Sequence, residues 1–62
     1  MSVANATKAQ MEALHKALVQ LEQETRFYNQ GLNPKKNVAA YVTAVNTLVD
    51  NVVTTATAVK NA

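Results

Sequence analysis

The sequence contains no cysteine and no tryptophan, only one glycine and one proline, and few aromatic or charged side chains. Without cysteine, the chain cannot form a disulfide-stapled fold, use thiol catalysis or hold zinc through thiolates. The absence of cysteine does not indicate whether the protein lies in an oxidising or a reducing compartment. The scarcity of glycine and proline argues against a collagen-like chain, and a hydrophobic content of 48% argues against disorder. A small helix-rich module is the class that remains.

The length of 62 residues allows one domain, 1–62. A domain of this size buries only about 60% of the surface that its unfolded chain exposes, so a deep pocket is not expected. The sequence also shows no nucleophile with a base and an orienting group, and no glycine loop that could hold a phosphate. We therefore predict a protein without enzymatic activity and without a cofactor.

The charge and the apolar stretches give little indication of a nucleic acid or a membrane. A formal net charge of +2 is too small to predict nucleic-acid binding by itself. The N-terminal residues lack the basic segment and apolar run of a secretory signal. Residues 37–59 carry many Asn and Thr side chains and Asp50, which are costly in hydrocarbon, so no membrane span is expected. By default the location is the cytoplasm, or the inside of a viral particle.

Apolar and small side chains recur at alternating intervals of three and four in two arms of the chain. This spacing is typical of coiled-coil helices. It predicts an all-α fold in which two helices, about 5–30 and 34–61, form an antiparallel hairpin around a common seam. The seam positions are Ala4, Thr7, Met11, Leu14, Leu18, Leu21, Thr25, Tyr28 and Leu32 in the first arm, and Val38, Val42, Val45, Val49, Val52, Ala56 and Val59 in the second.

The residues at the helix boundaries support this hairpin. We predict the turn at 31–34, where Gly31 can take the left-handed conformation that ends a helix. Asn33 would cap the second helix and Pro34 would occupy its first position. A connection this short makes the two helices antiparallel neighbours. At the start of the first arm, Thr7-Lys8-Ala9-Gln10 resembles a capping box.

The charged residues of the first arm are spaced for pairing along a helix. Glu12 with Lys16 and Glu22 with Arg26 are pairs four residues apart, each worth a few tenths of a kcal/mol. These pairs account for acidic residues without a catalytic carboxylate pair.

A metal site is also considered, because Glu12 and His15 have the Glu-x-x-His spacing of di-iron bundles. In the expected hairpin Asp50 lies near their level. However, the seam defined by the apolar residues turns Glu12 toward solvent, and the sequence has no second Glu-x-x-His. We expect a solvated histidine and no metal.

The apolar stripe of the second arm is wider than one neighbouring helix can cover, since Tyr41, Leu48 and Val53 lie beside the expected seam. Residues 37–59 also carry Asn and Thr in place of most charged residues, and a low content of charge is typical of the centre of an interface. The alternative is that Asn and Thr only keep an exposed helix soluble. We predict self-association through Met11, Leu14, Leu18, Leu21, Tyr28, Val38, Tyr41, Val42, Val45, Leu48, Val49, Val52, Val53 and Val59.

Two functions from different classes are consistent with these patterns. The first is a self-associating structural or assembly subunit, for example of a viral particle or filament, present as a homo-oligomer or in a larger protein assembly. The second is a small regulator or inhibitor that binds nucleic acid or an acidic protein surface through a basic hairpin tip made of Arg26, Lys35 and Lys36. A solvated turn also explains these three charges.

Two resemblances bear on these alternatives. In its helix-turn-helix heptads the whole chain resembles the Rop family of plasmid-copy-control RNA-binding proteins. That resemblance implies a hairpin that dimerises into a four-helix bundle. The Asn33-Pro34 turn, followed by Ala39-Ala40-Tyr41, is similar to type III secretion needle subunits, which implies a subunit of a larger assembly.

Overall fold

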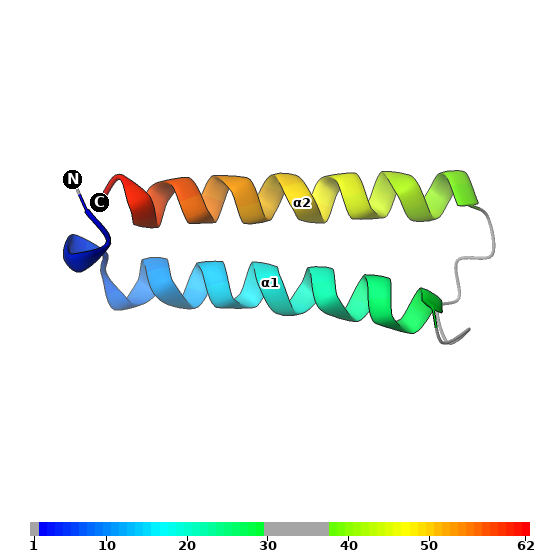
Figure 1. The fold of residues 1–62 in the computed structure, drawn as a ribbon, viewed down its shortest axis with the longest axis horizontal. Coiled ribbons are helices and arrows are strands. Elements are labelled where there is room, and N and C mark those ends of the chain that lie inside the picture. Colours follow the sequence, from blue (N-terminus) through cyan, green and yellow to red (C-terminus); the bar gives the residue numbers. More distant parts are fainter. Residues whose placement is uncertain (1, 30–37) are drawn as a thin grey trace.

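The computed structural model describes residues 2–29 and 38–62, which form two long antiparallel helices preceded by a short turn (Figure 1). A 3₁₀ turn, η1, spans Val3–Asn5, helix α1 spans Lys8–Asn29 and helix α2 spans Val38–Lys60. The described residues contain no strand, so the predicted all-α hairpin is confirmed. The predicted turn at 31–34, with Gly31, Asn33 and Pro34, lies outside the described residues.

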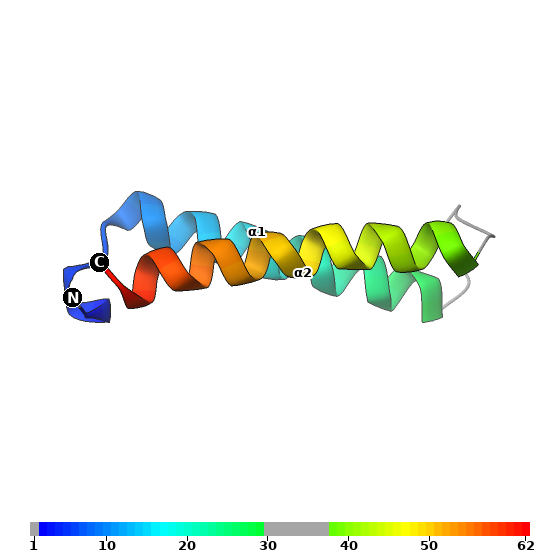
Figure 2. The same cartoon turned by 90° about the horizontal axis from the view of Figure 1, so that it is seen from above.

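The helices pack against each other along their length and cross at a shallow angle (Figure 2). The hairpin measures 42 × 17 × 13 Å between Cα atoms. Its Cα radius of gyration is 13.8 Å, whereas a globular chain of this length has about 11 Å. The molecule is therefore a rod in which one line of contact joins two helices.

Helix α1 begins with the predicted capping box. The backbone N–H of Thr7 donates to Oε1 of Gln10 over 2.9 Å, and the N–H of Gln10 donates to Oγ1 of Thr7 over 3.1 Å. The predicted start near residue 5 is wrong, because Ala6 has an extended backbone and the cap at Thr7 satisfies the free N–H groups of a helix that starts at Lys8.

Helix α2 is helical despite its many β-branched residues, as predicted. Three of its threonine hydroxyls donate to the carbonyl four residues earlier. Thr43 bonds Ala39 at 3.0 Å, Thr47 bonds Thr43 at 3.2 Å, and Thr55 bonds Asn51 at 2.7 Å. These hydroxyls are satisfied within the helix, so α2 presents mainly methyl groups at these positions.

The two ends of the chain meet at one end of the rod (Figure 1). The backbone N–H of Ser2 donates to the carbonyl of Ala62 over 2.9 Å, and η1 packs on α2. This packing helps to bury Val59, which is only 4% exposed. The short N-terminal turn thus closes the end of the seam.

The observed seam differs in register from the predicted one. Ala17 is 4% exposed, whereas its neighbour Leu18, which the pattern places in the seam, is 47% exposed. Four further large apolar residues of the predicted seam are also exposed: Met11, Val38, Val42 and Val49. In their place the half-buried side chains include Gln10, Tyr41, Leu48 and Thr55. The small side chain of Ala17 needs little room between two packed helices, whereas Leu18 at the same place would need more.

The capping box gives a direct test of the helix start. Replacing Thr7 with Ala removes the hydroxyl that accepts from Gln10, and we expect a loss of about 1 kcal/mol in the free energy of unfolding. Urea denaturation followed by far-UV circular dichroism measures this loss. The matched control is Thr47→Ala inside α2, where alanine improves helix propensity and stability should not fall. Equal losses in both variants would contradict the cap.

Candidate functional site

The side chains of each helix that lie on or near the seam form three parallel columns. These columns explain the register of the seam between α1 and α2. A central column contains Leu14 and Leu21 in α1, and Val45 and Val52 in α2, all half-buried. The inner column, three residues after each central residue, faces the other helix. The outer column, four residues after each, turns away from it. The inner positions are Gln10, Ala17, Glu24, Tyr41, Leu48 and Thr55; the outer ones are Met11, Leu18, Thr25, Val42, Val49 and Ala56.

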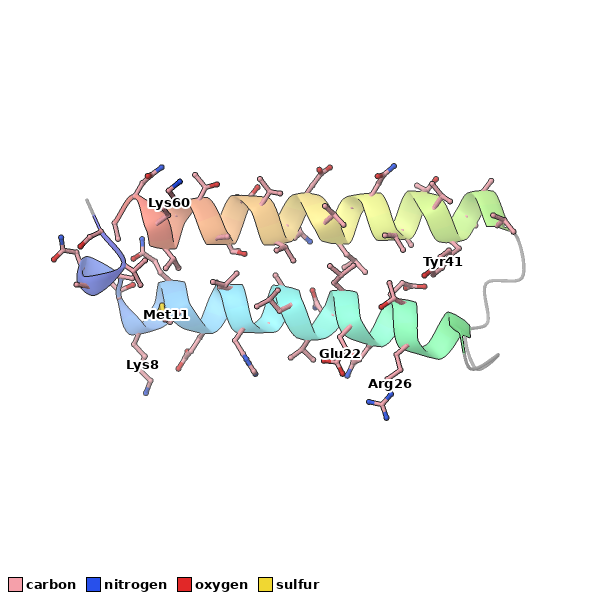
Figure 3. The ribbon with its side chains drawn as sticks, viewed as in Figure 1. Lys8, Met11, Glu22, Arg26, Tyr41 and Lys60 are labelled. Atoms are coloured by element: carbon pink, nitrogen blue, oxygen red, sulfur yellow. The ribbon has the colours of Figure 1, made fainter. Side chains whose placement is uncertain are left out.

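The outer columns of both helices lie on the same side of the hairpin. In both helices a step of four residues from the central column turns in the same sense. Because α1 and α2 are antiparallel and face each other, a turn in the same sense brings both columns to one side. Figure 3 looks onto this side, where the sulfur of Met11 lies in front of the α1 ribbon.

The large exposed apolar side chains of both helices gather on this side, which we call the outer face. Leu18 in α1 is 47% exposed and Val53 in α2 is 58% exposed. These exposed apolar side chains are grouped on one side of both helices and are not dispersed over the surface. The outer face is therefore a candidate interaction site. Its residues are Met11, Leu18, Val42 and Val49 of the outer columns, together with Val53, four residues after Val49, and Val38 at the start of α2.

The opposite side of the hairpin has a different character. Many of its exposed positions carry small or neutral polar side chains, among them Ala13, Gln20, Thr47, Asn51 and Ala58. None of the exposed large apolar side chains found in the described residues of α1 and α2 lies there. Among the described residues, the outer face is therefore the side suited to apolar contact.

The predicted association residues divide between the seam and the outer face. Tyr41 and Leu48, predicted beside the seam, lie in it, and Tyr41 points toward α1 in Figure 3. Val53 is exposed on the outer face, as the broad stripe suggests. The side chain of Tyr28 lies outside the described part. Sequence reasoning missed Ala17 in the seam, because the apolar intervals select Leu18.

The charged side chains of α1 pair with one another along that helix. Arg26 Nη1 lies 3.7 Å from Glu22 Oε1, which confirms that predicted pair, but Glu12 lies 3.8 Å from Nζ of Lys8 instead of pairing with Lys16. Lys8 and Arg26 point away from α2 in Figure 3.

The proposed basic tip is only partly represented in the structure. Arg26 belongs to the described residues and pairs with Glu22. Lys35 and Lys36 lie outside them. The described part of the chain therefore does not bring the three basic residues together.

The described residues show no assembled chemical centre. Glu12 and His15 are exposed, and within the described ranges no three His, Asp or Glu side chains gather as a metal site would require. No charged or polar residue in the described part is buried. Neither α1 nor α2, as far as they are described, is long and apolar enough to cross a membrane.

Comparisons of the chain with family models, with curated proteins and with solved structures find no match. The function is therefore argued from the fold and its surfaces.

The seam register can be tested by filling it. We expect Ala17→Leu to lower the free energy of unfolding by about 1–3 kcal/mol, because a large side chain would force the helices apart. Ala13→Leu adds the same side chain at an exposed position of α1 and should change stability by less than about 0.5 kcal/mol. Urea denaturation of both variants measures the difference. If Ala17→Leu were as harmless as the control, the observed register would be wrong.

Proposed function

We propose that the protein is a non-enzymatic structural subunit that self-associates through its outer face. The observation that carries the proposal is the position of the exposed apolar side chains, which lie on one side of both helices. Apolar patches that extend over several elements are uncommon on monomers and are typical of protein interfaces. The outer face is also free of charge at its centre, as interface centres usually are.

The total surface of the hairpin supports association. The chain exposes 4521 Å², whereas a compact monomer of 6.7 kDa exposes about 3,900 Å², an excess of about 600 Å². Small domains without disulfides or metals commonly rely on oligomerisation. A neighbour packed on the hairpin would reduce the surface that each chain exposes.

The central column of each helix gives a second reason to expect association. Leu14, Leu21, Val45 and Val52 remain half-buried in the single hairpin, between the seam and the outer face. A helix in a bundle contacts two neighbours, so its apolar stripe is wider than one seam requires. A neighbour on the outer face would complete the burial of these side chains.

The alternative function, a regulator that acts through the basic tip, gains less support. The guanidinium of Arg26 is already paired with Glu22 on the same helix. The outer face, by contrast, consists wholly of described residues. We therefore prefer self-association.

Sedimentation across a range of protein concentrations tests the proposal. We expect a mass that rises to a multiple of 6.7 kDa. Val53→Asp should return the mass to that of the monomer, because association would bury an unpaired charge. The matched control, Asn51→Asp, adds the same charge to an exposed position on the opposite side of α2 and should leave the mass unchanged.

Two results would count against the proposal. A wild-type mass of 6.7 kDa at every concentration, with full helicity, would show that the hairpin does not associate. Loss of association in both aspartate variants would show that the outer face is not the contact. Replacing Lys35 and Lys36 with Glu should leave the mass unchanged, whereas loss of association in that variant would move the contact to the tip.

A further inference from the structure

The N-terminal segment of the chain folds back over the end of the rod instead of extending from it. η1 packs on α2, and Figure 2 shows it beside the last turn of that helix. Residues 2–5 are nevertheless exposed, and Val3 is 55% exposed. We call residues 2–6 the strap. The strap covers part of α2 while most of its own side chains stay in water.

The strap lies where the seam is best shielded from water. Val45, Val52 and Val59 occupy equivalent positions of α2, spaced by seven residues. Val45 and Val52, which lie along α1, are half-buried, whereas Val59 is 4% exposed. Among the described elements, η1 is the one that packs on α2 besides α1. The additional burial of Val59 therefore comes from the strap.

Few bonds hold the strap closed. The backbone N–H of Ser2 donates to the carbonyl of Ala62 over 2.9 Å. The other backbone bonds of the strap are internal, since Asn5 donates to Ser2 and Ala6 donates to Val3. One hydrogen bond contributes little net free energy because water competes for the same groups, while each ordered residue loses conformational entropy. The closed strap is therefore only weakly favoured over an open one.

The start of α1 does not depend on the strap. The reciprocal bonds between Thr7 and Gln10 satisfy the first N–H groups of this helix without it. The strap joins the cap through Ala6, which has an extended backbone with φ −65° and ψ 139°. A rotation about the backbone of Ala6 can therefore move the strap while the first turn of α1 stays formed.

We propose that the strap is a gate over the end of the seam. It opens and closes as one unit, hinged at Ala6, while α1 and α2 stay folded, and it controls the access of solvent and solutes to Val59. Local openings of this kind require less free energy than global unfolding. The inference does not rest on the proposed function, because neither Val59 nor the strap belongs to the outer face.

Thiol labelling tests the gate, because the chain has no cysteine of its own. In full-length Val59→Cys the introduced thiol is covered while the strap is closed and reacts with an aromatic disulfide reagent when the strap opens. The control is Ala58→Cys, at the neighbouring exposed position. We expect Val59→Cys to react more slowly than the control. Its rate should change little with urea below the unfolding transition, because opening of the strap exposes little surface.

A second substitution tests the bond that closes the strap. Adding Ser2→Pro to Val59→Cys removes the N–H that donates to Ala62, and proline cannot adopt the φ of −155° at this position. We expect labelling to become about fivefold faster, the effect of losing one hydrogen bond, with an unchanged far-UV circular dichroism spectrum. The matched control Ser2→Ala keeps the N–H and should not change the rate, because the Ser2 side chain makes no capping hydrogen bond.

Three results would overturn the gate. Labelling of Val59→Cys as fast as that of Ala58→Cys would show that the strap does not cover Val59. A labelling rate that rises with urea as steeply as global unfolding would show that the strap opens only together with the helices. An unchanged rate in the Ser2→Pro variant would show that the bond to Ala62 does not hold the strap. A mass of 6.7 kDa at every concentration, by contrast, would overturn the proposed function and leave this inference standing.

Discussion

The structure depends on one narrow line of contact between α1 and α2. Ala17 and Val59 are the apolar side chains most fully removed from water in the described residues, and one of them is an alanine. An alanine at the contact lets two backbones approach closely but buries little apolar surface. Because burial of apolar surface drives folding, a hairpin held by this line alone has a weak driving force. The outer face offers the remaining apolar surface to a neighbour.

Local interactions explain why each segment is helical, while tertiary contact explains how the helices pair. Thr7 and Gln10 cap α1 reciprocally, and the threonines of α2 satisfy their hydroxyls on the preceding turn. These bonds connect residues close in sequence and form in any copy of the chain. The choice of seam, by contrast, depends on which side chains meet across two helices. An isolated hairpin and an associated one would therefore share their helices and differ in stability.

The sequence predicts the hairpin, its antiparallel order, the capping box and the Glu22–Arg26 pair, because each follows from residue types at fixed spacing. The seam register does not follow in this way. The inner column holds Gln10 and Ala17, and the outer column holds Met11 and Leu18, so hydrophobicity alone selects the outer one. A stripe two columns wide is compatible with two seams. The folded hairpin uses the seam that buries Ala17 and leaves Leu18 47% exposed.

The dependence of thermal stability on protein concentration tests the central claim most directly. If association through the outer face supplies much of the stability, unfolding is coupled to dissociation, and the Tm rises by several degrees for each tenfold increase in concentration. Far-UV circular dichroism over three decades of concentration measures this rise. A Tm that stays constant over that range, with a cooperative transition, would show that the two helices are stable on their own contact and would contradict the account.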